Sequence, residues 1–294
     1  MGSAIHRLDD GNSITVPLAR VDDLSRVGAA AAQYGAILGR SVEIVSIVSP
    51  DDDFAEEFRR LSASVQGFAD SIDQTIRFHL ISHESLLNGV LESCRDRLTC
   101  MATAASPFHN EHYVGSFAAS LLRESTAPVI LVGPSVTEAQ VAPSTVVVAV
   151  ATDIDSHASM LTGQTFARAI GAPMTKVVID PTGIVYETDY HDPSVAFSDE
   201  VHAAMSSGPL TQNEITTELV ERSQAAMLVV ATRAQQGLSW ICEGSVSFDA
   251  TGLTSHPVIA VGPNAFDEDV ANEHGRFPLQ AKSATFVAIP ASAR

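Results

Sequence analysis

The sequence contains the stretch Pro128-Val129-Ile130-Leu131-Val132-Gly133-Pro134, which recurs 129 positions later as Pro257-Val258-Ile259-Ala260-Val261-Gly262-Pro263. Two further matches share this offset: Gly115-Ser116 with Gly244-Ser245, and Ala102-Thr103 with Ala231-Thr232. Near the start of each half the offset becomes 132, which aligns Leu38-Gly39 with Ile170-Gly171. Because internal repeats fix the architecture of a chain, these matches predict two copies of one domain in tandem.

Strand-like segments alternate with helix-like segments in both halves. In the first half we expect strands at 14–18, 42–48, 75–81, 98–103 and 128–132, and helices at 22–38, 53–72, 86–95 and 113–124. In the second half we expect strands at 145–150, 174–179, 200–206, 225–231 and 257–261, and helices at 156–170, 211–223 and 245–253. Apolar strands that alternate with helices indicate a parallel sheet covered on both faces. The sequence therefore predicts an α/β fold with two tandem Rossmann-like, doubly wound domains, each a mainly parallel five-stranded sheet.

The repeat also sets the expected domain boundaries. We expect the first domain over residues 1–139, the second over 140–265 and a C-terminal extension over 266–294. The extension contains a strand-like run at 283–289, directly before Pro290. Such a run can add to the edge of this chain's own sheet or of a partner's sheet, and the alternative is a disordered terminus.

Composition excludes several classes of function. The 294 residues carry a net charge of −18, and phosphate backbones and anionic membranes repel such a surface. We therefore expect no nucleic-acid partner and no membrane, and no apolar run approaches the roughly 20 residues of a membrane span. The first residues lack the apolar core of a secretion signal, and the three cysteines lack metal-ligand spacing. We expect a cytoplasmic protein with buried, reduced thiols.

The topology predicts where a ligand would bind. A doubly wound sheet binds ligands outside the carboxyl ends of its strands, at the point where the strand order reverses. In each half the loops after the first and fourth strands occupy this place. These loops begin at the following residues: Ala19 and Thr103 in the first half, and Ala151 and Thr232 in the second.

A Gly-Ser pair opens the helix after the fourth strand in each half, at the same spacing from Ala105 and from Ala234. This layout resembles the universal stress protein family over residues 12–134 and 144–263. In that family the first strand typically ends in an acidic residue, and a G-x-x-G-x9-G-S/T signature follows the fourth strand. The resemblance implies a stress-response function with ATP or AMP as the ligand. Glycine backbone, a helix N-terminus and the hydroxyl would hold its phosphates.

Both halves depart from this pattern at the same places. Alanine replaces the first two glycines of the signature (Ala102, Ala105, Ala231 and Ala234) and stands at the acidic position (Ala19 and Ala151). A Cβ directed at a phosphate and a lost carboxylate would together weaken nucleotide binding by orders of magnitude. If nucleotide binding is retained, we expect it at these residues: Ala19, Met101, Ala102, Thr103, Ala105, Gly115, Ser116, Phe117, Ala151, Thr152, Val230, Ala231, Thr232, Arg233, Ala234, Gly244, Ser245 and Val246.

Other polar groups predict no catalytic or metal site. His109 and His112 could share a metal, and Asp189 with His191 could bind a cation, but solvated loops and polar turns explain both groups. The sequence contains neither a G-x-S-x-G nucleophile motif nor a P-loop with its lysine. The sequence therefore lacks the motifs that a hydrolase or a kinase-like enzyme would need, and we expect no enzyme.

Three hypotheses follow. The first is a non-enzymatic stress-response protein that acts through protein contacts, its nucleotide sites being largely lost. The second is an ATP- or AMP-binding regulatory protein that uses the retained Gly-Ser loops. The third is a nucleotide or metal-dependent hydrolase, which rests only on the histidine and aspartate groups above. The resemblance implies an intrachain pseudo-dimer through the final strands of the two halves, further pairing into a homo-oligomer, and protein partners as yet unknown.

Overall fold

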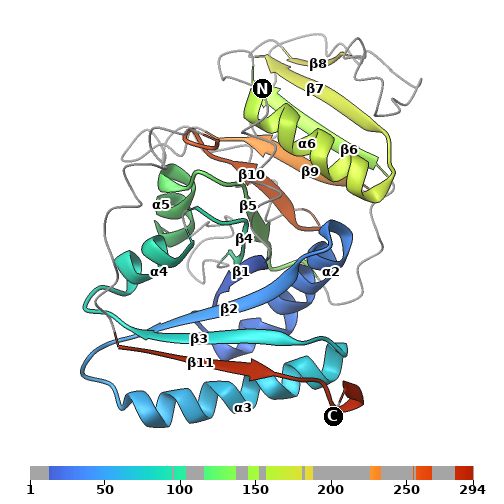
Figure 1. Cartoon of the computed structure of the whole chain (residues 1–294). Helices are drawn as coiled ribbons and strands as arrows, with labels where there is room; N and C mark the ends of the chain where they lie inside the picture. The colour runs from blue at the N-terminus through green and yellow to red at the C-terminus, as the bar shows by residue number, and fades with distance from the viewer. Residues whose placement is uncertain are drawn as a thin grey trace. The chain divides into compact units, whose positions relative to one another are not determined.

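The computed structural model describes residues 13–94, 96–103, 116–136, 145–151, 157–180, 183–187, 226–232, 254, 256–266 and 282–293 (Figure 1). These residues cluster into two compact units. Unit 1 contains the described residues of Met1–Ala102, Glu124–Ala127 and Phe266–Arg294, and unit 2 contains those of Thr103–Arg123 and Pro128–Ala265. The predicted boundaries at 139 and 265 stay a prediction.

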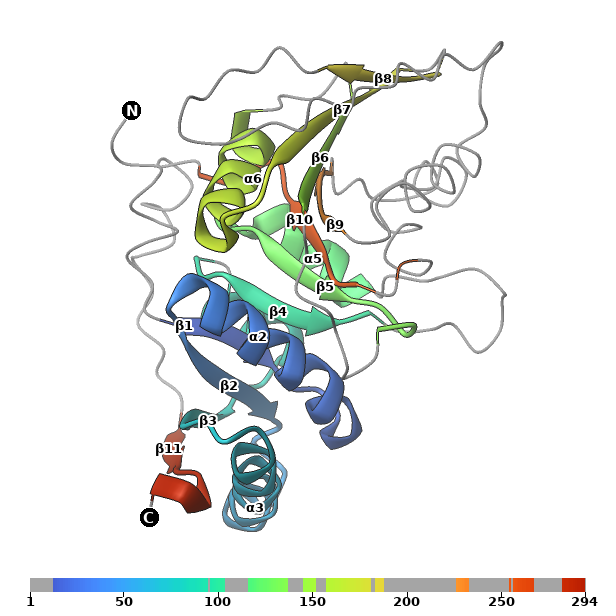
Figure 2. The same ribbon diagram turned by 90° about the vertical axis from the view of Figure 1, so that its right-hand side faces the viewer.

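The sheet of unit 1 has the strand order β11-β3-β2-β1-β4. Its parallel strands are β1 (Ser13–Pro17), β2 (Ser41–Val48), β3 (Ile76–Ser82) and β4 (Thr99–Ala102). The C-terminal strand β11 (Ser283–Ala288) pairs antiparallel with β3 at the edge of this sheet (Figures 1 and 2). The strand order reverses at β1, which has β2 on one side and β4 on the other.

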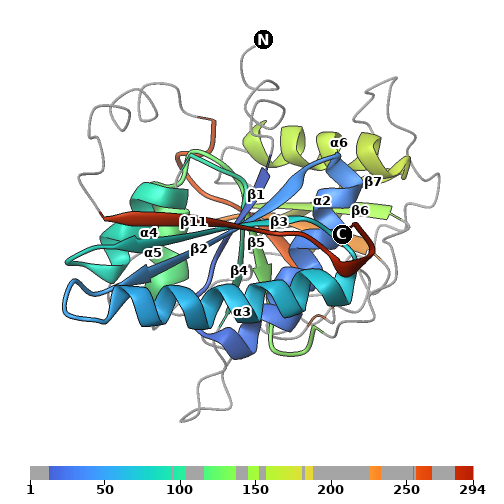
Figure 3. The same ribbon diagram turned by 60° about the horizontal axis from the view of Figure 1, so that its bottom comes forward.

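Helices cover both faces of this sheet. After two short turns, Val21–Asp23 and Leu24–Gly28, come α2 (Ala29–Leu38), α3 (Phe54–Ile72) and α4 (Leu86–Cys94). A Cβ on Gly35 of α2 would meet Val42, whereas one on Gly89 of α4 would meet Ile47. Because successive residues of a strand point to opposite faces, α2 and α4 lie on opposite faces of β2. Figure 3 shows α3 running alongside β3 and β11.

Local sequence explains where these helices begin and end. The Asp53 carboxylate accepts hydrogen bonds from the backbone N–H groups of Ala55 and Glu56, which caps the start of α3. Helix α2 ends at Gly39, whose φ of 66° lies in the left-handed region, and α6 of unit 2 ends at Gly171 with a φ of 65°. These two glycines are the ones that the repeat aligns, so the same C-terminal cap follows the same helix in both halves.

The sheet of unit 2 has the strand order β5-β10-β9-β6-β7-β8. Its strands are β5 (Val129–Val132), β6 (Thr145–Ala151), β7 (Met174–Asp180), β8 (Gly183–Glu187), β9 (Ala226–Ala231) and β10 (Val258–Val261). The four strands from β10 to β7 are parallel. The two outer pairs, β5 with β10 and β7 with β8, are antiparallel. The described helices of this unit are α5 (Ser116–Glu124) and α6 (His157–Ile170).

The structure confirms the mainly parallel α/β fold that the alternation of strands and helices predicts. It adds strand β8, which forms a hairpin with β7 at residues where the sequence predicts neither a strand nor a helix. The strand expected at 200–206 and the helices expected at 211–223 and 245–253 lie outside the described residues.

Candidate functional site

A pocket of about 360 Å³ lies in unit 1 where the chain leaves the carboxyl ends of β1 and β2. This is the end of the sheet at which the strand order reverses around β1, the place where doubly wound sheets bind ligands. The volume falls within the roughly 300–1,000 Å³ of small-molecule sites. The pocket is lined by Leu18, Ala19, Arg20, Val21, Asp22, Ser46, Ile47, Val48, Glu57, Arg60 and Leu61.

Hydrogen bonds join Leu18, the residue after β1, to β2 beside this pocket. The backbone N–H of Leu18 donates to the carbonyl of Val45 (2.8 Å), and the buried Ser46 hydroxyl donates to the carbonyl of Leu18 (3.1 Å). The other lining residues come from the first half of α3, which contributes Glu57 and Arg60. The Asp53 cap fixes the start of this helix, one turn before Glu57. Cap and strand contacts thus fix the pocket's backbone.

The charges that line the pocket balance one another. Arg60 forms an ion pair with Glu57 one turn earlier on α3 (2.7 Å), and the Arg20 guanidinium lies 3.8 Å from the Asp22 carboxylate. Two cations and two anions leave no excess positive charge, so the lining does not concentrate an anionic ligand electrostatically. The Arg20–Asp22 pair is largely exposed and the Arg60–Glu57 pair is about half exposed, so water can satisfy both without a ligand.

Ala19 lies in this pocket, at the position where the sequence analysis expects the missing acidic group. Its methyl group can accept a hydrogen bond neither from a ribose hydroxyl nor from a base amine. The neighbouring carboxylates, Asp22 and Glu57, come from other elements and already face arginines. The described lining therefore contains no unpaired carboxylate for a ligand.

The loops after the fourth strands begin in the same way in both halves. The backbone N–H of Thr103 donates to the carbonyl of Val132 (3.0 Å), and that of Thr232 donates to the carbonyl of Val261 (2.9 Å). Both bonds lie in unit 2. The two donors are 129 positions apart, and so are the two acceptors, which is the offset of the repeat. The loops predicted to hold phosphate thus leave the sheet from matched positions.

The structure places the described candidates at strand and helix ends. Met101 and Ala102 end β4, Val230 and Ala231 end β9, Ala151 ends β6, and Ser116 and Phe117 begin α5. The other predicted site residues lie outside the described residues: Ala105, Gly115, Thr152, Arg233, Ala234, Gly244, Ser245 and Val246. The same holds for the residues weighed as metal or cation ligands, His109, His112, Asp189 and His191.

Cysteines and metal-binding side chains form no site among the residues that the structure describes. Cys94 and Cys100 are buried free thiols, and burial raises the pKa of the Cys94 thiol to about 12. Such a thiol stays protonated and unreactive at neutral pH. Within the described ranges, no three His, Cys, Asp or Glu side chains are grouped to hold a metal ion. The described helices also include none with the length and apolar character of a membrane span.

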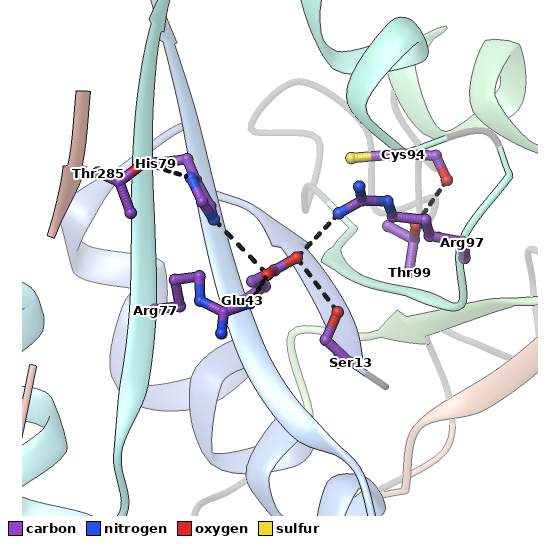
Figure 4. A network of polar contacts seen from close by, with 8 residues as sticks. All are labelled: Ser13, Glu43, Arg77, His79, Cys94, Arg97, Thr99 and Thr285. Carbon is purple, nitrogen blue, oxygen red and sulfur yellow. Dashed lines mark hydrogen bonds and ion pairs between the residues drawn. The ribbon is translucent and has the colours of Figure 1, made fainter. Parts of the chain in front are cut away.

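A buried ion cluster at the opposite end of β2 was missed by the sequence analysis (Figure 4). Glu43 is 5% exposed and accepts hydrogen bonds from Arg77 (2.6 Å) and Arg97 (2.8 Å). The Ser13 hydroxyl also donates to it (3.1 Å), and the His79 Nε2 lies 3.6 Å from the carboxylate. The nearby His79 imidazole, followed by the hydrogen bond from Arg77, the charge of Arg97 and the hydrogen bond from Ser13, outweighs the effect of burial and lowers the pKa of Glu43 to about 2.

This cluster joins the strands of unit 1 rather than forming a cleft. Ser13 begins β1, Glu43 lies in β2 and Arg77 lies beside it in β3, at the amino ends of the parallel strands. His79 continues the cluster to β11, because its Nδ1 lies 3.0 Å from the Thr285 hydroxyl. The sequence signal that could have identified it is a single charged residue, Glu43, in a strand of apolar residues and serine, with arginine and histidine in the next strand.

Comparison with known proteins identifies the fold. No protein-family model matches the sequence, and no curated protein sequence matches it. Among solved structures, the chain is similar to a universal stress protein from Archaeoglobus fulgidus DSM 4304 (TM-score 0.55, 13% identity, 86% of this chain and 99% of that chain). It is also similar to a candidate universal stress protein from Pseudomonas aeruginosa UCBPP-PA14 (TM-score 0.51, 12% identity, 92% and 99%).

A third similar structure is a functionally unknown protein from Pseudomonas aeruginosa PAO1 (TM-score 0.52, 11% identity, 92% of this chain and 99% of that chain). All three likenesses extend over nearly the full length of the other chain. Identities this low carry the arrangement of strands and helices and not the chemistry of a site. The chain therefore has the fold of the universal stress proteins.

Proposed function

We propose that this chain is a non-enzymatic, cytoplasmic stress-response protein of the universal stress protein type, which acts through protein contacts and has largely lost its nucleotide sites. The observation that carries the proposal is the lining of the β1–β2 pocket. Ala19 offers no carboxylate there, and both arginines already face acidic side chains. A nucleotide entering this pocket would gain few new polar contacts and would have to displace ion pairs that water already solvates.

The β5–β10 ladder supports the intrachain pairing of the final strands that the resemblance implies. These strands belong to the two copies of the repeated Pro-Val-Ile stretch and pair antiparallel, Ile130 opposite Ile259. Every residue of both strands is at most 2% exposed. Such burial is typical of a permanent contact, and it agrees with an intrachain pseudo-dimer formed by the final strands of the repeats.

A second candidate function, an ATP- or AMP-binding regulatory protein, is favoured by one observation. The pocket exists, at the carboxyl ends of the strands and with the volume of a small-molecule site. Arg60 would be its best phosphate contact if the Glu57 pair opened. The two functions differ in one measurable property, which is nucleotide affinity.

Titration calorimetry and thermal melting with ATP and AMP, in the presence of Mg²⁺, test the choice. The protein must first be shown by its absorbance ratio to be free of nucleotide. A micromolar ligand supplied at a thousand times its Kd would raise the free energy of unfolding by about 4 kcal/mol. We expect no binding heat and no shift of the melting temperature at millimolar nucleotide.

Matched variants locate any binding that does occur. Arg60→Glu reverses a charge in the pocket, whereas Arg59→Glu reverses its neighbour, which pairs with Glu56 outside the pocket. Micromolar binding that Arg60→Glu abolishes and Arg59→Glu leaves intact would establish the regulatory function in the β1–β2 pocket. Micromolar binding lost on Ser245→Ala and Gly244→Val would establish it in the second half. Either result overturns the proposal of lost sites.

A further inference from the structure

We propose that two copies of this chain pair through strand β11, antiparallel and with Thr285 on the twofold axis. β11 is the last strand of the unit 1 sheet, and among the described residues no strand pairs with its outer edge. This inference concerns the C-terminal extension and is independent of whether the pocket binds a nucleotide. It identifies a second copy of the chain as the partner, and it assigns the contact to an edge outside the sequence repeat.

The C-terminal segment is firmly attached to unit 1, so its edge is a defined surface. The Gln66 amide of α3 donates to the carbonyl of Ile289 (2.8 Å), and the Ser292 hydroxyl hydrogen-bonds to Asp73 at the end of the same helix. At the other end of the strand, the Lys282 ammonium lies over the Phe54 ring, 4.4 Å from its centre. Figure 3 shows β11 and α3 side by side.

The register determines which backbone groups point outward. Ser82 N–H donates to the Lys282 carbonyl (2.9 Å), and Ser283 lies opposite Ile81. In an antiparallel pair, residues that exchange hydrogen bonds with the partner alternate with residues that do not. Alternate residues from Ala284 onward therefore bond to β3. The N–H and C=O groups that point to the outer edge belong to Ser283, Thr285 and Val287.

The described strand of this edge lacks charged residues, proline and a bulge, the features within a strand that prevent edge pairing. Monomeric proteins protect edge strands with lysine, proline or a bulge, whereas residues 283–288 contain no charge and no proline. The nearby Lys282 is held over Phe54 instead of standing on the edge. Of the four large apolar side chains that are exposed within the described residues, two lie here: Val287 (48%) and Ile289 (42%).

The same edge is complementary to itself. A twofold axis at Thr285 places Thr285 opposite Thr285 of the second copy, and Ser283 opposite Val287. The N–H and C=O groups of all three outward residues then bond to the second copy. The two copies together form about six hydrogen bonds. On the other face of the strand, Ala284 comes opposite Phe286, a small side chain against a large one. A twofold axis at any other residue would leave some of these outward N–H and C=O groups unpaired. The net charge of −18 does not prevent the contact, because the pairing segments themselves are uncharged.

Light scattering after size-exclusion chromatography of the full-length chain tests the pairing. The wild type should have twice the 31.0 kDa mass of one chain. Val287→Lys places a charge on the exposed edge and should raise the dimer dissociation constant at least tenfold, giving monomer at dilutions where the wild type is dimeric. The control Leu86→Lys makes the same charge change at an exposed apolar residue of α4 and should remain dimeric.

Cysteine crosslinking tests the register. Paired Cα atoms in a hydrogen-bonded antiparallel position lie about 5.5 Å apart, within disulfide range. Thr285→Cys should therefore form an intermolecular disulfide on mild oxidation, whereas Val287→Cys, which faces Ser283 in this register, should not. A monomeric wild type, a Val287→Lys protein that stays dimeric, or a Thr285→Cys protein that does not crosslink would each overturn the proposal.

Discussion

Gly262→Ala is expected to lower the free energy of unfolding by roughly 3 kcal/mol, the largest effect that we expect from a single methyl group in this chain. A Cβ at this position would overlap with the carbonyl oxygen of Leu122 and would lie 3.0 Å from its carbonyl carbon. Both are backbone atoms of α5, so no side-chain rotation can relieve the overlap. Either α5 or the end of β10 must move, and β10 is buried together with Ala118, Leu121 and Leu122 of α5.

Gly67→Ala is the matched control for this substitution. Gly67 lies inside α3, and a Cβ there would meet nothing within 4 Å. Alanine in a helix interior is favoured over glycine by about 0.5–1 kcal/mol, so this variant should be slightly more stable than the wild type. Urea unfolding of the three proteins measures both effects. A Gly262→Ala protein as stable as the wild type would contradict the close approach of α5 to the end of β10.

The Gly262 contact shows what kind of information the sequence holds. The repeated Pro-Val-Ile stretch identifies the final strand of each half, and β5 and β10 form there. The repeat also aligns Gly39 with Gly171, and both adopt the left-handed cap. Apolar runs and caps are local signals, and they predicted the described parallel strands within a few residues. Gly262 is needed because of a tertiary contact with α5, and no local sequence pattern could have predicted that contact.

At the candidate site, too, local signals were predictable from the sequence and tertiary contacts were not. The strand order reverses at β1, and Ala19 lines a pocket there, as the rule for doubly wound sheets predicts. Glu57 and Arg60 were not predicted, because helical periodicity shows which side of α3 is apolar and not which polar residues reach a pocket at its first turns. The Gly-Ser loops lie outside the described residues, so their role stays a prediction.

Glu43 was missed for a related reason, and it supports the second large prediction. Its partners Ser13, Arg77 and Arg97 lie 30 to 54 positions away in sequence and meet it only when the sheet forms. Glu43→Gln keeps the shape of the side chain but removes the charge that these donors share. We expect a loss of about 2–3 kcal/mol of stability at pH 7. The loss stays below the full cost of a broken buried pair because both arginine side chains are more than half exposed.

Glu56→Gln is the matched control for the charge itself. Glu56 also pairs with an arginine, Arg59, but both side chains are more than half exposed on the surface of α3. Exposed pairs of this kind contribute about 0.3–0.5 kcal/mol, so this variant should unfold close to the wild type in urea. Equal effects of the two substitutions would mean that Glu43 is not buried in a hydrogen-bonded cluster.

The pH dependence of the Glu43 effect provides the sharper test. Folding lowers the pKa of Glu43 from 4.5 to about 2, chiefly through the nearby His79 imidazole and then through Arg77, Arg97 and Ser13. A group whose pKa is lower in the folded state stabilises the fold above its unfolded pKa and loses that contribution as the pH falls toward the folded value. The stability gap between the wild type and Glu43→Gln should therefore be constant above about pH 5.5 and shrink by more than half by about pH 3. Subtracting the variant cancels the titration of the other carboxylates, so a gap that stays constant down to pH 3 would mean that the Glu43 carboxylate does not hold its charge against these donors.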